Sequence, residues 1–338
     1  TYPFVRSFVF VLWVLKNVLK TKKLTVSLAA AFLKIWKPKV IISFIDNSGS
    51  LGMLKQIYPD LLAISVQNGV RMDFANPATP IMGFDQYYSF GEVEKEILFV
   101  GGHTTNQTYP IGSLKAGLFY EKYQEPKHKE YDICLISQFS TVTFDKSDIW
   151  TYDRITAYHE SGKRLFNVVV EYVKKFGLKL CVTMRLNENF SRYSDECSFY
   201  SSPKLTKVHY IPKIGYSSYE AAQNSKLIIC ISSTLGYELL GMGSRVLFAK
   251  DLDAVASLVL NGLWNKNFFT HRLPELQRLY TDNFDEFNSK ASALMNMSDK
   301  EYSKYSEKSR LYYMNFDKNN LPQNIIKNRI KKLFPCSI

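Results

Sequence analysis

The N-terminal segment has no apolar run long enough to cross a membrane. Its uninterrupted apolar run, Phe8–Leu15, lies between Arg6 and Lys16 and is well short of the roughly 20 residues that a spanning helix needs. The segment also lacks the A-x-A-like cleavage pattern of a signal peptide. Two alternatives remain open for Tyr2–Lys23: a helix buried in the first domain, or an interfacial helix on a membrane surface.

An interfacial helix would bring Trp13 and a group of cations to anionic headgroups. These cations are Lys16, Lys20, Lys22 and Lys23. Both alternatives hold if one face of the helix is buried and another is exposed. The expected location is therefore cytoplasmic, with a peripheral position on the inner face of the plasma membrane as an option.

The sequence has few cysteines and histidines, and none is spaced like a metal site. Its five cysteines are scattered. Cys134, Cys181 and Cys230 each sit inside an apolar run, where a free thiol behaves as a small hydrophobe. Unpaired thiols favour a reducing, cytoplasmic compartment. The histidines are isolated and are interpreted as structural, so we expect no metal and no cofactor.

Several nucleotide-binding and catalytic signatures are missing. There is no Gly-rich dinucleotide fingerprint, no Walker-type loop, no G-x-S-x-G turn and no internal repeat. Zinc-finger spacing, an RNA-binding aromatic strand signature and a long Arg-rich arm are also absent. These absences argue against specific nucleic-acid recognition.

The chain does contain enough apolar sequence for two cores. It has 338 residues, of which 46% are hydrophobic and 14% aromatic, so two domains are the default. Its 43 Lys and Arg outnumber its 31 Asp and Glu, which gives a net charge of +12 and favours an anionic partner. The first residue is Thr1 rather than Met. A chain processed or truncated at its start, without its first strand, is therefore one expectation.

The most informative stretch is Lys226–Phe248. Leu227–Ile231 is a short apolar run that suits a strand buried on both faces of a parallel sheet. After three hydroxyl residues, Leu235–Met242 has apolar side chains at helical spacing and predicts a short helix that Gly243 ends. Val246–Phe248 opens the next strand.

The three hydroxyls, Ser232, Ser233 and Thr234, precede this helix directly. A helix N-terminus favours negative charge through its free N–H groups and its dipole, so a phosphate or sugar carboxylate could bind there. Glu238, one turn on, could accept hydrogen bonds from ribose or sugar hydroxyls. The alternative is that Ser233 or Thr234 only caps the helix and that Glu238 is a solvated helix residue.

This stretch resembles the donor-nucleotide segment of glycosyltransferases with the GT-B fold. The resemblance rests on the apolar strand, Ser-Ser-Thr, Gly-Tyr-Glu, Gly-Met-Gly and Val-Leu-Phe, and extends as short motifs over Lys39 to Phe248. It is similar above all to enzymes that build bacterial capsule and lipopolysaccharide. The resemblance implies an α/β protein of two Rossmann-like domains facing a central cleft, with C-terminal helices packing back on the first domain.

In the first domain, polar residues follow two predicted strands. Val40–Ile45 ends at Asp46, whose carboxylate could act as base or nucleophile in an interdomain cleft. Leu61–Val66 is followed by a polar turn containing Gly69, which we expect to have a positive φ. The resemblance places this turn on the acceptor side. Its candidate acceptor-binding residues are Gln67, Asn68 and Arg71.

In the second domain, Tyr131–Ser137 and Leu178–Met184 are predicted strands. The residues that follow them belong, by the same resemblance, to the donor site: Gln138, Ser140 and Arg185. Glu188 could be an acid, a base or only the partner of Arg185. Relatives often carry a His-Pro loop at this point, so the departure leaves the donor class open.

The expected domain limits are residues 1–120 for the acceptor-side domain, 131–298 for the donor domain and 299–338 for a helical tail. Phe119–Glu130 loses apolar periodicity and is the predicted linker. Further helices are expected at Leu24–Trp36, within Tyr152–Phe176, and at Asp251–Trp264 and Leu273–Phe287.

The predicted function is transfer of a sugar from a nucleotide-activated donor to a growing surface polysaccharide or lipopolysaccharide. The resemblance includes enzymes that use CMP-activated Kdo, which we rank slightly above UDP- and GDP-sugars. Two alternatives are kept: a nucleotide-sugar epimerase of the same fold, and a catalytically inactive scaffold in a membrane-associated assembly complex.

Overall fold

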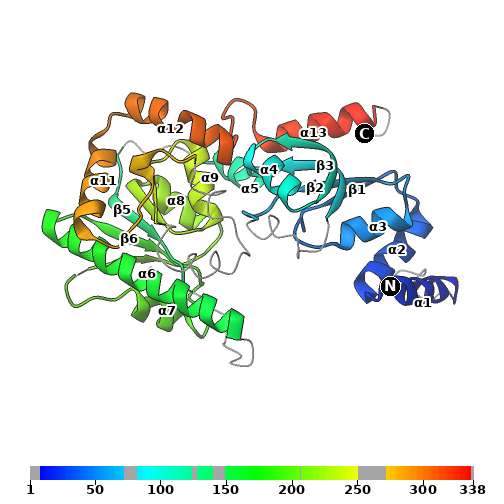
Figure 1. The fold of residues 1–338 in the computed structure, drawn as a ribbon, viewed down its shortest axis with the longest axis horizontal. Coiled ribbons are helices and arrows are strands. Elements are labelled where there is room, and N and C mark those ends of the chain that lie inside the picture. The colour runs from blue at the N-terminus through cyan, green and yellow to red at the C-terminus, as the bar shows by residue number, and fades with distance from the viewer. Residues whose placement is uncertain are drawn as a thin grey trace. The chain divides into compact units, whose positions relative to one another are not determined.

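The chain folds into two compact α/β units, seen in the computed structural model of Figure 1. Unit 1 comprises residues 1–89 and 94–110, and unit 2 comprises residues 90–93 and 111–338. The structure describes residues 8–71, 82–123, 128–139, 149–205, 207–249 and 272–335. Each unit has its own parallel sheet.

Unit 1 is built on a four-stranded parallel sheet in the order β1-β2-β3-β4. Its strands are β1 (Val40–Ser43), β2 (Leu62–Val66), β3 (Gly83–Ser89) and β4 (Thr104–Pro110). Its helices are α1 (Phe8–Thr21), α2 (Leu24–Trp36), α3 (Ser50–Ile57) and α4 (Val93–Val100). The predicted strands at 40–45 and 61–66 are confirmed to within two residues because short β-branched runs between polar turns leave few other assignments.

Unit 2 is built on a five-stranded parallel sheet in the order β7-β6-β5-β8-β9. Its strands are β5 (Tyr131–Ile136), β6 (Leu180–Thr183), β7 (His209–Ile211), β8 (Ser225–Cys230) and β9 (Val246–Phe248). Its α-helices are α5 (Leu114–Tyr120), α6 (Ile149–Phe176), α7 (Tyr193–Phe199), α8 (Ser217–Gln223), α9 (Thr234–Met242), α11 (Phe284–Asn296), α12 (Asp299–Tyr313) and α13 (Pro322–Leu333). In chain order the strands read 3-2-1-4-5, which is the Rossmann order 3-2-1-4-5-6 without its sixth strand.

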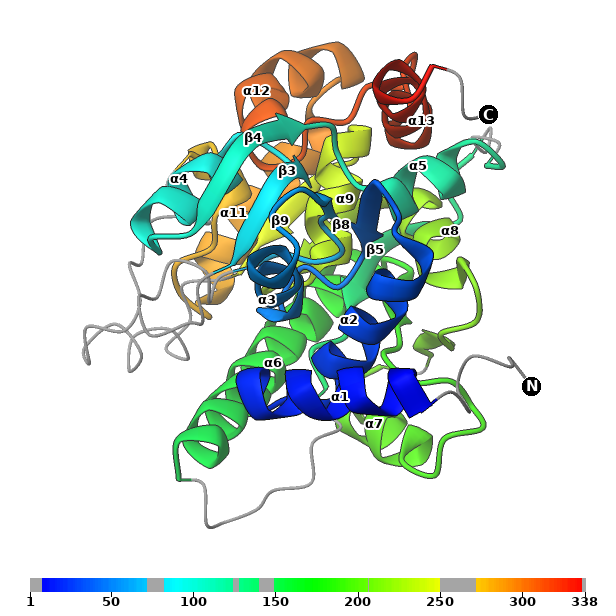
Figure 2. The same ribbon diagram turned by 90° about the vertical axis from the view of Figure 1, so that its right-hand side faces the viewer.

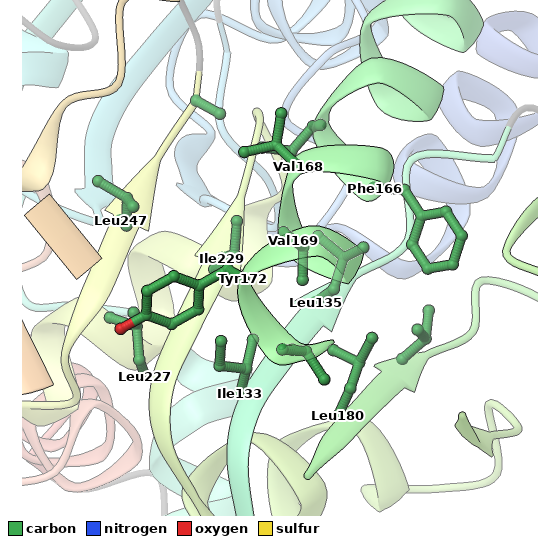
Figure 3. Close-up of a cluster of buried hydrophobic side chains, with 14 of the residues drawn as sticks. Ile133, Leu135, Phe166, Val168, Val169, Tyr172, Leu180, Leu227, Ile229 and Leu247 are labelled. Carbon is green, nitrogen blue, oxygen red and sulfur yellow. The ribbon is translucent and has the colours of Figure 1, made fainter. Parts of the chain in front are cut away.

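The core of unit 2 lies between this sheet and the helix α6. Figure 3 shows Val169 and Tyr172 of α6 beside Ile133, Leu135 and Ile229 of the sheet, and all five side chains are buried. Strand residues two apart share a face, so this face is covered by α6 and α11, while α8 and α9 contact the same strands from the other side. A sheet covered on both faces requires the continuous apolar runs that the sequence shows.

The N-terminal helices of unit 1 are buried on one face only. Phe10 and Val14 of α1 pack against Ala31 of α2, and the two helices lie together in Figures 1 and 2. Several large apolar side chains of the pair are exposed: Val11, Leu12, Leu15, Leu19, Leu24, Leu28 and Trp36. Among the described residues, no helix is both long and apolar enough to span a bilayer.

The C-terminal segment returns to residues 90–120. Asn315 N donates to Phe90 O at 2.8 Å, and α13 packs against α5. A Cβ added at Gly91 would lie 2.3 Å from Tyr312 O, so this close approach requires glycine. The C-terminal helices thus pack on part of the range predicted for the first domain, although these contacts fall within unit 2.

The chain passes from unit 1 to unit 2 for the last time between Pro110 and Ile111. This point precedes the linker predicted at Phe119–Glu130, of which residues 124–127 lie outside the described residues. The predicted domain limits and the shared cleft stay predictions.

The helix predicted at Leu273–Phe287 is wrong over residues 273–283. A 3₁₀ turn, Glu275–Gln277, forms there, Leu279 N donates to Phe248 O at 2.8 Å, and α11 begins only at Phe284. The backbone of Arg278 forms a parallel bridge with Phe248 at the open edge of β9. The backbone hydrogen bond gained there stabilises an extended conformation more than the helical spacing of the apolar residues stabilises a helix. Asn283 then caps α11 by accepting from Asp285 N at 2.7 Å. The helix predicted at 251–264 lies outside the described residues.

Candidate functional site

The carboxyl ends of β5 and β8 form the centre of the candidate site in unit 2. The strand order of this sheet reverses between these two neighbouring strands, and open α/β sheets bind ligands at such a point. Gln138 follows β5 and Ser232 follows β8, and Ser232 Oγ donates to Gln138 Oε1 at 3.5 Å. Residues 94 positions apart are therefore brought together.

The helix α9 begins at the predicted hydroxyl cluster. Ser233 is its N-cap, with an extended backbone and a hydroxyl that accepts from Leu235 N at 3.3 Å. Thr234 is its first residue, and Gly243 ends it with φ of 96°. The geometry shows the capping role of Ser233, and its predicted role in donor binding stays a prediction.

Arg185 comes to the same edge from β6. Its Nη1 donates to Phe139 O at 3.1 Å, while the residue as a whole is exposed. Glu188 is exposed as well, and no ion pair links it to Arg185 in the described part of the chain. The interpretation of Glu188 as the partner of Arg185 is therefore wrong. Both residues are exposed, so water can solvate each charge without an ion pair. Ser140 lies outside the described residues.

Glu238 is buried inside unit 2 and is not a solvated helix residue. Ser113 donates to its Oε1, and Tyr219 Oη donates to its Oε2 at 2.6 Å. Burial raises the pKa of Glu238, and the two hydroxyls oppose that rise. Because each oxygen already accepts a hydrogen bond, Glu238 ties α9 to the start of α5 and to α8. Its contact with ribose hydroxyls stays a prediction.

The second group of predicted residues lies in unit 1, around Asp46. The side chain of Asp46 is buried and forms an ion pair with Arg71. Tyr87 Oη donates to Asp46 Oδ2 at 3.2 Å. Burial raises the pKa of Asp46, whereas the positive charge of Arg71 opposes the rise and favours the carboxylate.

The polar turn after β2 joins the same cluster. Asn68 donates to Phe44 O and accepts from Arg71, so the turn is tied to the end of β1. The positive φ predicted for Gly69 is wrong. A Cβ at this position would lie 2.8 Å from Arg71 Nη1, so the Arg71 side chain would have to shift to admit a larger residue.

Glu94 of α4 belongs to this cluster and was missed by sequence reasoning. Gln67 Nε2 donates to Glu94 Oε1 at 2.7 Å, while Glu94 Oε2 is buried without a hydrogen-bond partner among the described residues. Burial, reinforced by the charge of Asp46, raises the pKa of Glu94 to about 8. In the sequence, Glu94 looks like an ordinary acid in the first turn of a helix, so no local signal could have found it.

The raised pKa of Glu94 predicts a pH-dependent stability. Between its ordinary pKa near 4.5 and about 8, the folded chain holds a proton that the unfolded chain releases. The group's contribution is therefore complete at low pH and is lost as the pH rises through this window, by at most about 1.4 kcal/mol per pH unit. Glu94→Gln, a mimic of the protonated acid, should flatten this slope in urea unfolding series.

Glu96→Gln, on the same helix and only partly buried, is the matched control for this series. Equal slopes for wild type and Glu94→Gln would contradict a protonated Glu94.

In the described part of the chain, no group of three or more His, Cys, Asp or Glu side chains is placed to hold a metal ion. The four described cysteines, Cys134, Cys181, Cys197 and Cys230, are free thiols.

Solved structures similar to this chain include two UDP-N-acetylglucosamine 2-epimerases. The "putative UDP-N-acetylglucosamine 2-epimerase" of Listeria monocytogenes is 16% identical, with a TM-score of 0.54 over 91% of this chain and 78% of its own. S. aureus MnaA, solved with UDP, is 13% identical, with a TM-score of 0.54 over 95% and 82%. The Neisseria meningitidis UDP-GlcNAc 2-epimerase bound to UDP-GlcNAc is 14% identical, with a TM-score of 0.53 over 91% and 80%. At these identities the likeness shows the fold, which is GT-B.

The sequence comparisons point to surface polysaccharide synthesis. No curated protein matches the chain. A protein-family model described as "putative O-antigen biosynthesis protein" matches residues 97–331, which is more than half of the chain. The chain belongs to this O-antigen biosynthesis family.

Proposed function

We propose that the chain is a glycosyltransferase that moves a sugar from a nucleotide-activated donor to a growing surface polysaccharide or lipopolysaccharide. The observation that carries the proposal is the convergence of Gln138, Ser232 and Arg185 at the strand-order reversal of unit 2. Membership of the O-antigen family supports the acceptor class. CMP-activated Kdo is the donor to test first, ahead of UDP- and GDP-sugars.

The donor's phosphate is the group that the unit 2 site would hold. The N-terminus of α9 provides N–H groups and a positive dipole end, and Arg185 has N–H groups left to donate. Stabilising the charge that develops on the leaving nucleotide is the main catalytic task of such a site. The proposed donor-binding residues are Gln138, Ser140, Arg185, Ser232, Ser233, Thr234 and Glu238.

In this proposal, the cluster around Asp46 binds the acceptor and provides the base or nucleophile. Arg71 favours the ionised form of Asp46, which is the form that a base or nucleophile needs. Gln67, Asn68 and Arg71 would bind acceptor hydroxyls, and Glu188 is a second candidate acid or base. The proposed reaction uses no metal and no cofactor, so a chelator should leave it unchanged.

Glu94 favours a second candidate, a nucleotide-sugar epimerase. Epimerisation requires proton transfer, and unit 1 holds a carboxylate beside Arg71 and a carboxyl group that keeps its proton near neutral pH. Two neighbouring carboxyl groups, one held ionised by a cation and one that keeps its proton, can act as a base and an acid. The likeness to solved epimerases supports the same candidate through the fold alone.

Nucleotide release separates the candidates. The protein is incubated with CMP-Kdo, UDP-sugars and GDP-sugars, with and without a polysaccharide acceptor. Acceptor-dependent release of one nucleotide supports a transferase, and a changed sugar on an intact donor supports an epimerase. If no nucleotide binds at all, the chain is a scaffold and the proposal fails.

We propose a cytoplasmic protein held peripherally on the inner face of the plasma membrane. The exposed apolar faces of α1 and α2 support this proposal, because they lie beside lysines and precede Asp46, the first acidic residue of the chain. Apolar area and cations together are what an anionic bilayer surface binds.

Charge reversal of Lys16, Lys20, Lys22 and Lys23 to Glu should release the protein from vesicles that contain anionic lipid. Each lost cation near the surface removes about 1 kcal/mol of attraction. Cosedimentation measures the bound fraction. The control variant reverses the charge of four exposed lysines of unit 2, Lys300, Lys304, Lys308 and Lys318. It changes the net charge by the same amount and should still bind the vesicles. Equal sedimentation of both variants would remove the interfacial helix from the proposal.

A further inference from the structure

The short helix α7 carries a carboxylate that is buried beside the candidate donor site. The side chain of Glu196 is 0% exposed. Its Oε1 accepts from Ser137 Oγ and from Arg185 N at 2.8 Å, and its Oε2 accepts from Leu186 N at 3.0 Å. Glu196 thus joins the loop after β5 to the loop after β6.

Such a carboxylate is costly to bury unless its oxygens are paired. Here two backbone N–H groups and a hydroxyl pair both oxygens. Ser137 Oγ also accepts from Phe139 N at 3.2 Å, so the contact extends along the loop that contains Gln138. The local shape of both loops depends on one side chain.

Tyr200 acts on the same loop from the end of α7. It follows Glu196 by four residues, a spacing that places both side chains on one helical face. The hydroxyl of Tyr200 is buried and accepts from Gln138 N at 2.7 Å. Through these two side chains, α7 holds the backbone of Gln138 and the backbone of Arg185, the two residues whose side chains meet the proposed donor.

We propose that Glu196 and Tyr200 are positioning residues for the donor-phosphate site: they fix the loop of Gln138 against the loop of Arg185. Neither residue touches the donor. The proposal rests on the proposed function, because it assigns the two loops to nucleotide binding. It also explains why Arg185 Nη1 meets Phe139 O across the loops at 3.1 Å.

Double-mutant cycles test the proposal through nucleotide affinity, measured by calorimetry with CMP, CDP, UDP and GDP. Glu196→Gln turns an N–H group toward backbone donors, and Tyr200→Phe removes the hydroxyl that accepts from Gln138 N. Each should weaken the best-bound nucleotide by about 10- to 100-fold, as expected for a misplaced binding group. In an Arg185→Gln background, Glu196→Gln should cause a smaller loss of affinity than in wild type, because part of its effect acts through Arg185.

Tyr210→Phe is the matched control. The hydroxyl of Tyr210 donates to Tyr200 O at 3.0 Å but reaches neither loop, so the affinity of this variant should equal that of wild type. Hydrogen exchange of the Arg185 and Leu186 amides gives a readout that needs no ligand, and it should accelerate in Glu196→Gln. Melting curves define a temperature at which all variants are folded.

Each possible result decides the proposal. If the losses of affinity caused by Glu196→Gln and Arg185→Gln are additive, the proposal is overturned while the proposed function stays intact. Unchanged affinity in Tyr200→Phe would have the same consequence. Wild-type protein that binds none of the four nucleotides would overturn the proposed function and this inference together. Accelerated exchange with unchanged affinity would show a purely structural role and would also overturn it.

Discussion

Replacing Ser233 and Thr234 together by alanine should lower the affinity for the donor nucleotide by about one to four orders of magnitude. Each hydroxyl would contribute a hydrogen bond to a charged phosphate, worth roughly 1.5–3 kcal/mol, and each 1.4 kcal/mol is a factor of ten in affinity. The same variant loses the cap that Ser233 provides to Leu235 N. Stability should therefore fall as well, by roughly 0.5–2 kcal/mol.

Calorimetric titration beside a melting curve separates binding from capping. Ser298→Ala is the matched control, since Ser298 caps α12 in a capping box with Glu301 and has no predicted role in binding. It should lower the melting temperature and leave affinity unchanged. A double alanine variant that behaves like Ser298→Ala would reduce Ser233 and Thr234 to caps and leave Arg185 and Gln138 as the donor-binding residues.

Replacing Arg71 by methionine should reduce the free energy of unfolding by about 3–5 kcal/mol near neutral pH. The change leaves the carboxylate of Asp46 buried without its counterion, and removing one partner of a buried ion pair costs this much. The loss should shrink toward about pH 4, because the unfolded chain then also protonates Asp46. Urea unfolding at several pH values measures both effects.

The double variant Asp46→Asn, Arg71→Met is the control for this prediction. It removes both charges, so it should recover part of the stability that the single variant loses. If Arg71→Met unfolds at the same urea concentration as wild type, Asp46 is not an ionised, buried partner. Asp46 would then be a poor candidate for base or nucleophile.

The residues at the carboxyl ends of the strands were predictable one by one. Gln138, Arg185 and Ser232 each follow a short, mainly apolar run, and buried parallel strands end at a common edge. The cap at Ser233 and the end of α9 at Gly243 were equally local, because hydroxyl and glycine residues act on the backbone next to them.

Other features depended on partners that the sequence pattern does not specify. Glu94 and Glu196 look like surface acids of short helices, yet both are buried because Gln67 and the Arg185 loop bring donors to them. The backbone of Arg278 is extended because it pairs with Phe248 at the edge of β9. The burial of Glu238 was equally unpredictable, because its oxygens accept hydrogen bonds from Ser113 and Tyr219.

The sequence by itself determined the α/β class, the strands and the polar groups that follow them, because each of these depends on side-chain periodicity and on backbone preferences within a few residues. Only the tertiary structure decided which carboxyl groups are buried, which are paired and which keep a proton. Those properties depend on desolvation and on hydrogen-bond donors contributed by distant segments, such as Gln67 for Glu94 and Ser137 for Glu196.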